Sequence, residues 1–459
     1  MKINAKGRFS FPGGVHPPQS KDLTSDSKIQ PGPRVKQVAI MLSQHTGAIC
    51  QPLVKKADPI QAGQKIGDAD AFISAPVHSP VNGKVKEIAL QSHAVLGRSP
   101  AVIVEANPDD NQLKQPCSAR FTLGFDDTSF SPEKICDAVR QAGIVGMGGA
   151  GFPTRVKIEP NPKMPKDTLI INGCECEPYI TCDYRIMLEW TNQIIAGIKL
   201  AGKASGCSKV FVGIEDNKPA AIEIITAALK KCVDGDGIKV VPVRTKYPQG
   251  GERQLIKAIL KKNVPTGQIP PMIGVLVLNV ATVAAIAEAV VCDWPLTHRV
   301  VTVTGEGIAN PGNYYAPIGI SVAELIELCG GLTEDAVRVI LGGPMMGIAI
   351  ADLTTPITKT TGAITVLTEK QIGGAKFTAR QTPCIRCGRC LQACPEHLNP
   401  TKIAHAVENN LLDLAESYYI NACIECGCCS YVCPANIELT GYIKTGKIYL
   451  ARKEKKMPQ

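Results

Sequence analysis

The sequence CIRCGRCLQACP, residues 384–395, is followed by CIECGCCSYVCP, residues 423–434. Both stretches contain the spacing CxxCxxCxxxCP, which is typical of bacterial proteins that hold two [4Fe–4S] clusters. In this pattern the first three cysteines of one stretch bind one cluster, and the cysteine before the proline binds the other. One stretch alone could be a zinc knuckle, but two complete copies with Pro395 and Pro434 in register favour iron–sulfur clusters.

The crossed pattern gives each cluster four thiolate ligands. The first cluster is predicted to be bound by Cys384, Cys387, Cys390 and Cys433, and the second by Cys423, Cys426, Cys429 and Cys394. Cys428 lies at a position that binds no iron in this pattern, and we interpret it as a free thiol. Residues 379–440 are therefore predicted to form a two-cluster ferredoxin domain that passes single electrons.

The composition predicts a multidomain protein of a reducing compartment. A chain of 459 residues is long enough for several domains, and its 19 cysteines, an odd number with metal spacing among them, do not form a disulfide framework. Thiolate ligands need reducing surroundings, so we expect the cytoplasm, and the N-terminus shows no secretory signal. The longest apolar run, 272–291, is interrupted by polar residues, so we expect no membrane span, which needs about 20 apolar residues.

The net charge of +9 is concentrated in a basic tail, residues 441–459. Nucleic acid is not an expected partner, because no nucleic-acid-binding motif is present. An anionic membrane surface or an acidic protein is the alternative partner for the tail, and a solvated tail fits the sequence equally well.

Residues 1–107 are predicted to form a β domain. Short alternating segments at 35–41, 71–73, 83–88 and 101–105 are separated by turns that contain proline and glycine. The stretch SAPVHSPVNGKVKEI, residues 74–88, resembles the barrel-sandwich fold of biotinyl and lipoyl domains. Those domains carry a modified lysine at a hairpin tip, but the corresponding tip here, 68–71, contains no lysine, so we expect no attached group.

A polar linker at 108–130 leads to a central domain at 131–297. Ser131 and Pro132 have the residue types of a helix N-cap and first turn. Apolar strands then alternate with helical segments, which favours a parallel sheet with helices on both faces. The expected strands are 168–171, 209–214, 239–243 and 274–278, and the expected helices are 183–200, 219–232, 252–261 and 282–291.

Residues 298–350 are predicted to form a β-grasp domain, because two short strands joined by an Asn-Pro-Gly turn precede a helix and a further strand. A second linker, 351–378, leads to the cluster domain, in which 403–417 is expected to be helical. The fold class is therefore multidomain α/β: a β barrel-sandwich module, a parallel-sheet domain, a β-grasp domain and a ferredoxin domain.

The stretch GIVGMGGAGFPTRVK, residues 143–157, is rich in glycine. Gly146, Gly148 and Gly151 satisfy the pattern GxGxxG, but an amphipathic helix precedes them instead of a strand, which argues against a dinucleotide fingerprint. Glycines allow backbone N–H groups to approach a flat ring or a phosphate, and Lys157 is placed to meet an anion.

Polar residues follow three of the predicted strands, at the edge where open α/β sheets bind ligands. They are Asn172, Glu175, Glu177, Glu215, Asn279 and Thr282. Each alone is typical of a turn or a helix cap, but together they predict one crevice.

Three stretches resemble the flavin- and NADH-binding subunit of respiratory complex I: GMGGAGFPT (146–154), NGCECEP (172–178) and YPQGGE (247–252). The β-grasp segment resembles the next, SLBB-like domain of that subunit. With the barrel-sandwich module before this core and the ferredoxin domain after it, the whole chain is similar to the RnfC (RsxC) family of the Rnf (Rsx) ion-translocating electron transport complex.

The resemblance implies a site for FMN and NADH. FMN would be held by Gly148, Gly149, Gly151, Lys157, Asn172, Glu175, Asn279 and Thr282, while Glu177, Glu215, Tyr247 and Glu252 would lie on the nicotinamide and adenosine side. The chain departs from the complex I pattern at Cys174, where that pattern has an aspartate, and at Cys176, where it has a serine. Together with Cys182, these cysteines could be a redox pair, metal ligands or buried thiols.

The resemblance also implies electron transfer from NADH to FMN, to one cluster, to the other cluster and to a membrane-embedded partner, coupled to translocation of Na⁺ or H⁺. A flavin suits this path because it accepts a hydride and releases single electrons. The expected location is the cytoplasmic face of the bacterial inner membrane, beside integral membrane subunits and with ferredoxin as a further partner. A soluble flavin/iron–sulfur reductase such as cobalamin reductase, or a non-catalytic electron-wiring subunit, are the alternatives.

Overall fold

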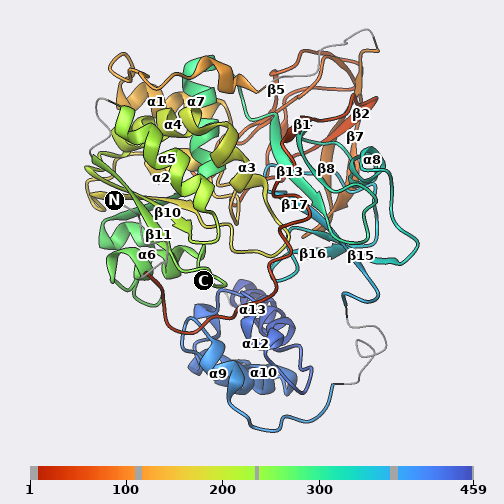
Figure 1. The fold of residues 1–459 in the computed structure, drawn as a ribbon. Helices are drawn as coiled ribbons and strands as arrows, with labels where there is room; N and C mark the ends of the chain where they lie inside the picture. The colour runs from red at the N-terminus through yellow and green to blue at the C-terminus, as the bar shows by residue number, and fades with distance from the viewer. Residues whose placement is uncertain (1–8, 109–115, 233–236, 373–380, 457–459) are drawn as a thin grey trace.

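The computed structural model describes residues 9–108, 116–232, 237–372 and 381–456, whose strands form four sheets (Figure 1). The four predicted modules are present, and the N-terminal segment packs on other modules. Residues 9–28 run along the central domain, where Phe9 pairs with Val243 and Val15 pairs with Tyr247, and the segment passes the cluster domain (Figure 1). The sheets of the first module begin only after this segment.

The barrel-sandwich module consists of a four-stranded and a three-stranded sheet. The first has the order β2 (Gln37–Met41), β8 (Gly97–Ala106), β7 (Gly83–His93), β4 (Pro59–Ile60), and the second has the order β3 (Gln51–Pro52), β5 (Lys65–Asp68), β6 (Val77–His78). Ile40, Ile66 and Val104 lie in its core. Residues 71–73, expected to be a strand, form a bend instead. The tip without lysine is docked on the central domain, since Asp68 Oδ1 lies 2.8 Å from Arg140 Nη2.

The central domain has the predicted parallel sheet, in the order β11 (Ile238–Val243), β10 (Lys209–Glu215), β9 (Thr168–Gly173), β12 (Val275–Asn279). One face is covered by α1 (Pro132–Gln141), α4 (Thr191–Ser205), α5 (Pro219–Lys231) and α7 (Val280–Cys292), and the other by α6 (Glu252–Leu260) (Figure 1). Ser131 caps α1 with Pro132 in its first turn, as predicted. The linker predicted at 108–130 includes a short 3₁₀ helix, Cys117–Arg120, and the buried Phe121 of this core.

The helix expected at 183–200 is two helices, α3 (Cys182–Glu189) and α4. Trp190 separates them with non-helical dihedral angles (φ −119°, ψ 31°). Its ring packs edge-on against Tyr315 of the β-grasp domain, with ring centroids 5.6 Å apart. The break therefore places an aromatic anchor between two domains, which the helical periodicity of the sequence does not reveal.

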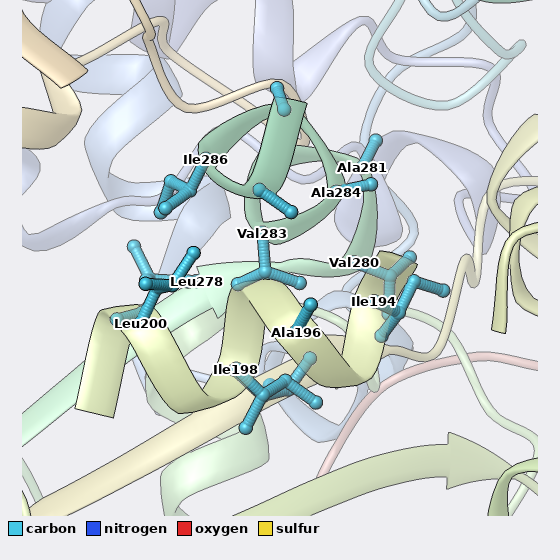
Figure 2. Close-up of a cluster of buried hydrophobic side chains, with 14 of the residues drawn as sticks. Ile194, Ala196, Ile198, Leu200, Leu278, Val280, Ala281, Val283, Ala284 and Ile286 are labelled. Atoms are coloured by element: carbon cyan, nitrogen blue, oxygen red, sulfur yellow. The ribbon is translucent and has the colours of Figure 1, made fainter. Parts of the chain in front are cut away.

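Helices α4 and α7 pack closely in the core of the central domain (Figure 2). Ile198 points away from this contact, whereas Val283 of α7 points toward α4 (Figure 2). Gly197 of α4 lies so close to Val283 that a Cβ at this position would overlap the Val283 carbonyl. Only glycine allows the two backbones this approach.

The β-grasp sheet has six strands, in the order β1 (Ile29–Pro31), β14 (Gly312–Pro317), β13 (His298–Thr304), β17 (Ala363–Thr368), β15 (Ala336–Leu341), β16 (Ile348–Ile350). Helix α8 (Val322–Leu328) begins with a capping box formed by Ser321 and Glu324. The linker predicted at 351–378 contains β17, which lies between β13 and β15 with all six residues buried. The sequence indicates a linker here because β17 follows all other strands of the sheet in the chain. In the structure β17 nevertheless lies in the middle of the sheet.

The cluster domain contains the short helices α9 (Arg389–Ala393), α10 (Pro400–Glu408), α11 (Leu412–Ser417) and α12 (Cys428–Tyr431), and a longer helix, α13 (Leu439–Lys456). The segment 403–417, predicted to be helical, is divided between α10 and α11. The predicted tail from 441 onward is mostly α13, which buries Ile443 and Leu450 against α10. It is therefore a structural helix of the cluster domain. Within the described ranges, no helix combines the length and apolarity that a membrane span requires.

Because α4 and α7 approach so closely at Gly197, adding one methyl group there should destabilise the protein. Gly197→Ala should lower the melting temperature of the full chain, because overpacking a core contact of this kind costs about 1–3 kcal/mol. Gly202→Ala in the same helix is the matched control, since the nearest atom to its Cβ would be the Cys207 carbonyl oxygen at 3.9 Å. Replacing a helical glycine there should stabilise by about 0.5–1 kcal/mol. Equal melting temperatures for the two variants would contradict this account.

Candidate functional site

The order of the central strands reverses between β9 and β12, which is where open α/β sheets bind ligands. The chain first adds β10 and β11 on one side of β9, and then returns to place β12 on the other side. Asn172 and Asn279 are register partners at the carboxyl ends of β9 and β12. The structure thus brings these two predicted residues together at the switch point of the sheet.

The glycine loop lies against the start of α7. The Met147 N–H donates to Thr282 Oγ1 over 3.0 Å, and a Cβ at Gly148 would stand 2.8 Å from Asn279 Nδ2. Gly149 differs, because a Cβ there would meet no atom within 4 Å. The loop follows α1, as the sequence predicts, and leads into α2 (Thr154–Ile158). A backbone with open space above a glycine fits a flat ring such as that of FMN.

Both asparagines are held by hydrogen bonds. Asn279 Nδ2 donates to Asp183 Oδ2 over 2.6 Å, and Asn279 Oδ1 accepts from the first turn of α7. Asn172 Nδ2 donates to the Gly250 carbonyl over 2.8 Å, and Asn172 Oδ1 accepts from the Cys174 N–H over 3.1 Å. These contacts fix the carboxyl edge of the sheet to α3 and to the loop before α6.

Lys157 supplies positive charge at this edge. Its Nζ lies 3.1 Å from Glu252 Oε1 and 3.3 Å from the Val277 carbonyl oxygen. Both side chains of the ion pair are partly exposed, at 29% and 39%, so the pair is weak and Glu252 can be exchanged for another anion. Lys157 and Glu252 therefore lie together on a partly exposed surface.

Glu175 is used within the protein. One oxygen of its carboxylate accepts from the Asp183 N–H over 2.6 Å and the other from the Tyr184 N–H over 3.3 Å, at the N-terminus of α3. Free N–H groups at a helix start stabilise a carboxylate there. Burial raises the pKa of Glu175, and the neighbouring Lys21 opposes that shift.

Two of the three cysteines near Glu175 are buried, and the third is partly buried. Cys174 is 0% exposed and Cys182 is 4% exposed, while Cys176 is partly exposed and its Sγ accepts from the Gly250 N–H over 3.3 Å. Burial raises the pKa of all three thiols above the usual range, which favours the thiol over the thiolate that a metal or a redox reaction needs. The ligand atoms of Glu175, Cys182 and Asp183 lie within 4.8 Å of one another, but α3 already engages the Glu175 carboxylate. The arrangement favours the buried-thiol interpretation.

Three residues predicted on the nicotinamide and adenosine side lie in other settings. Glu215 is 0% exposed, and its carboxylate pairs with Lys218 at 3.2 Å. Glu177 accepts from the Met345 N–H and the Met346 N–H of the β-grasp domain, over 3.2 and 2.8 Å. These hydrogen bonds tie the segment 174–178 to its surroundings. Because Glu215 is enclosed, we correct it from a nucleotide contact to a support of that segment, whereas Glu177 is partly exposed and its nucleotide role stays a prediction.

Tyr247 is the third of these residues, and its ring is only 1% exposed. Its hydroxyl donates to the Cys426 carbonyl over 2.8 Å, and the ring packs with Val15, Ala393 and Cys428. A nucleotide cannot reach a ring buried in this way, so the predicted role of Tyr247 is corrected as well. It joins the central domain to a cluster loop.

Two residues of the site have no signal in the sequence. Lys21, from the N-terminal segment, donates to the carbonyls of Glu175, Glu177 and Ile180 over 2.6–2.9 Å. Thr46, from the barrel-sandwich module, donates from Oγ1 to the Ala150 carbonyl over 2.7 Å, and its N–H donates to Gly151. Both hold loops of the central domain from distant parts of the chain, and such contacts cannot be read from local patterns.

The cysteines of the two motifs lie at two depths. One cavity is lined by Cys394, Cys423, Cys426 and Cys429, the four thiols predicted to bind the second cluster, and also by Cys428. A cavity whose lining includes the four predicted thiols suits an iron–sulfur cluster. In the predicted set for the first cluster, Cys384 and Cys387 are exposed and Cys390 is buried. We call residues 423–429 the inner cluster loop and residues 384–390 the outer cluster loop.

The two loops repeat the same backbone 39 residues apart. Arg386 and Glu425 both have a φ of 57°, and Gly388 and Gly427 have φ values of 74° and 80°. The Arg386 N–H donates to Cys384 Sγ over 3.4 Å, and the Glu425 N–H donates to Cys423 Sγ over 3.3 Å. N–H groups directed at sulfur are the donors that tune the potential of a cluster, so both loops fit the predicted cofactors.

Protein-family models match the chain in four places. They are the Nuo51 FMN-binding domain at 139–288, the RnfC barrel sandwich hybrid domain at 9–109, the SLBB domain at 300–349 and the 4Fe-4S dicluster domain at 377–444. The four matches follow the order of the four modules in the structure.

Curated relatives are similar over most of the chain. It is 41% identical to the C subunit of the proton-translocating ferredoxin:NAD(+) oxidoreductase complex of Clostridium ljungdahlii, covering 89% of this chain and 87% of that one. It is 40% identical to the C subunit of the Na(+)-translocating ferredoxin:NAD(+) oxidoreductase complex of Acetobacterium woodii, covering 89% of each. Among solved structures, a NAD+-reducing [NiFe]-hydrogenase in the air-oxidized state is 21% identical, with a TM-score of 0.49, and covers 67% of this chain and 57% of its own.

The crossed cluster assignment predicts which cluster each proline-linked cysteine supports. Cys394→Ser should damage the cluster of the inner loop, because Cys394 lines the same cavity as the three cysteines of that loop. Cys433→Ser is the matched variant and should damage the other cluster. Electron paramagnetic resonance of the reduced, anaerobically reconstituted variants distinguishes the two, and a loss of signal in the opposite order would show that the assignment is wrong.

The buried ion pair between Lys218 and Glu215 predicts that removing one partner strongly lowers the free energy of unfolding. Lys218 donates to the Cys174 carbonyl over 2.6 Å and pairs with Glu215, so Lys218→Met leaves a buried carboxylate without its cation. Removing one partner of a buried pair costs about 3–5 kcal/mol, and urea denaturation of the full chain should show this loss. The double variant Lys218→Met/Glu215→Gln should recover part of it; a double variant no more stable than Lys218→Met would contradict the pairing.

Proposed function

The chain belongs to the family of C subunits of ion-translocating oxidoreductase complexes, and from this premise we propose how its own residues carry out NADH oxidation in such a complex. The subunit has an FMN-binding domain and a dicluster domain, and it works as a subunit of a multi-subunit oxidoreductase. When bound, FMN and the two clusters convert the hydride of NADH into single electrons.

The observation that carries the proposal is the path of residues 247–250. Gly250 accepts a hydrogen bond from Asn172 at the switch point of the sheet, and Tyr247 donates one to Cys426 in the inner cluster loop. Three residue steps of backbone span at most about 11 Å. A single short segment thus connects the proposed flavin site to the cysteines of the inner loop.

In this proposal the glycine loop and Asn279 form the floor under the FMN ring. Gly148 permits the loop to lie on Asn279, and Gly149 leaves open space above the backbone. Lys157 offers a cation to the phosphate of FMN in place of its exchangeable partner Glu252. Asn172 and Thr282 fix the two loops that enclose the site.

The inner cluster loop is more buried than the outer one, and this difference supports an order in which electrons pass the two clusters. The inner loop contacts the central domain through Tyr247 and receives electrons first. The outer loop exposes Cys384 and Cys387 and releases them. Lys447 Nζ donates to the Cys423 carbonyl over 2.6 Å and pairs with Glu425 at 2.9 Å, so α13 holds the inner loop in place.

We further infer that the subunit lies on the cytoplasmic face of the cell membrane, beside integral membrane subunits that receive its electrons, and that ferredoxin and an anionic membrane surface are further partners. The named relatives translocate protons or sodium ions as complexes with ferredoxin and NAD+ as reactants. Three features support a peripheral place for this subunit: the reducing surroundings that iron–sulfur clusters need, the net charge of +9, and the absence of an apolar spanning helix from the described ranges.

A titration with NADH tests the proposed function. The full chain, purified without oxygen and loaded with FMN and clusters, should lose flavin and cluster absorbance together when NADH is added. Clusters that form while FMN does not bind, or a bound flavin that NADH leaves oxidised, would contradict NADH oxidation and favour a non-catalytic electron-wiring role.

The open space above Gly149 predicts a selective effect on FMN. Gly149→Ala should fold normally, since its Cβ meets no protein atom within 4 Å, but its methyl group would enter the space assigned to the ring. A steric cost of about 1–3 kcal/mol corresponds to a roughly ten- to hundredfold weaker FMN affinity, measured by fluorescence quenching of FMN. Gly146→Ala in the same loop is the control, because its Cβ would have only ordinary contacts at 3.7 Å and beyond. Unchanged FMN affinity in Gly149→Ala would place the flavin elsewhere.

A further inference from the structure

The two cluster loops have the same backbone but different surroundings. In the inner loop, Cys426 is buried at 7% exposure, and its carbonyl accepts from the Tyr247 hydroxyl. A Cβ at Gly427 would stand 2.8 Å from the Met345 carbonyl oxygen, so the β-grasp domain lies directly on this glycine. Ile424 packs into the same apolar cluster, between the central and the cluster domain. The inner loop is covered by other domains of its own chain.

The outer loop presents the equivalent groups without a cover. Ile385, the counterpart of Ile424, is 66% exposed, and Cys387, the counterpart of Cys426, is also exposed. A Cβ at Gly388, the counterpart of Gly427, would meet nothing within 4 Å among the residues that the structure describes. The isoleucine, the middle cysteine and the glycine that contact other domains in the inner loop thus have exposed counterparts 39 residues earlier in the outer loop.

The residues that differ between the loops differ in charge. Glu425 and Cys428 of the inner loop correspond to Arg386 and Arg389 of the outer loop. Glu425 is neutralised by Lys447 at 2.9 Å, and Cys428 is 0% exposed. Arg386 and Arg389 are both exposed, and no ion pair joins either of them to another part of the described chain. The open loop therefore carries two positive charges beside an exposed isoleucine and two exposed ligand cysteines.

We propose that the outer cluster loop, residues 384–390, is the docking surface for another redox subunit of the same complex, which presents an acidic rim and covers Ile385. The proposal rests on the proposed function, because it takes the outer cluster to be the exit for electrons. The inner loop shows the mode of contact: an apolar side chain is covered and a hydrogen-bond donor meets the carbonyl of the middle cysteine. The two arginines select a partner of opposite charge and steer its approach.

An acidic protein fits this surface better than a lipid headgroup does. An anionic membrane would satisfy the arginines, but it has no acceptor for the electrons that the exposed cluster loop delivers. A protein can cover Ile385 and bring its own redox group against Cys384 and Cys387, as the central domain does for the inner loop. The exposed isoleucine at the centre with charges at the rim is also the usual anatomy of a specific protein interface.

The test measures binding of the full chain, loaded with its clusters, to the membrane sector of the complex. The membrane sector is purified from a strain that lacks this protein and is placed in uncharged phosphatidylcholine nanodiscs. Arg386→Glu/Arg389→Glu should bind roughly tenfold more weakly or worse, with a flatter dependence on salt. Ile385→Ala should also weaken binding, but it should leave the salt dependence unchanged. Iron content and the paramagnetic resonance of both clusters verify that the variants are folded.

Arg452→Glu is the matched control, because Arg452 is an exposed arginine on α13 of the same domain. It should bind like the wild type. Equal binding of the wild type and the Arg386→Glu/Arg389→Glu variant would overturn the proposal, and so would an equal loss in Arg452→Glu. If the wild type binds only protein-free vesicles of anionic lipid, the surface is a lipid site and the proposal is wrong. The binding assay needs no NADH, so it fails or succeeds independently of the NADH titration that tests the proposed function.

Discussion

The contact between the Tyr247 hydroxyl and the Cys426 carbonyl is the constraint on which the rest of the arrangement depends. Electron transfer between two cofactors requires that their domains keep a fixed separation. The cluster domain follows the β-grasp domain in the chain, yet its inner loop packs on the central domain. A buried hydrogen bond between the two, with an apolar cluster around it, fixes the distance between them.

Buried ammonium groups secure the other domain contacts in a similar way. Lys359 donates to the carbonyls of Pro76 and Gly143 over 2.6 and 2.7 Å, and so joins the barrel-sandwich module to the central domain. Lys21 does the same for the N-terminal segment and the loop at 175–180. Burial lowers the pKa of both lysines, which shows that the surroundings disfavour the charged form. Such groups are tolerated only because backbone carbonyls replace the lost water, so the contacts select one geometry of the domains.

The sequence predicts the elements that depend on local residue spacing. It does not predict the roles of residues that are set by contacts with distant parts of the chain. The central strands and the Ser131 cap follow from periodicity and turn residues, and the structure confirms them. The barrel-sandwich module was expected from a resemblance and the ferredoxin domain from the spacing of its cysteines. The predicted basic tail lies largely in α13, whose packing the sequence does not reveal, because its apolar residues are sparse and gain their meaning only against α10. Glu215 and Tyr247 follow the pattern of nucleotide-site residues, yet both are buried, since the partners that bury them, Lys218 and Cys426, cannot be inferred from spacing.

The crossed ligand pattern explains how two equal loops can acquire unequal roles. Cys394 and Cys433 are each predicted to bind the cluster of the other repeat, so a movement of either loop would disturb both clusters. This requirement keeps the backbone conformation of the two loops the same. The residues between the ligands are free of that requirement. In the inner loop one of these positions is Cys428, a small buried residue that lets Tyr247 approach, while its counterpart Arg389 stays in solvent. A duplicated motif can thus keep its cofactor geometry while one copy faces the chain itself and the other faces outward.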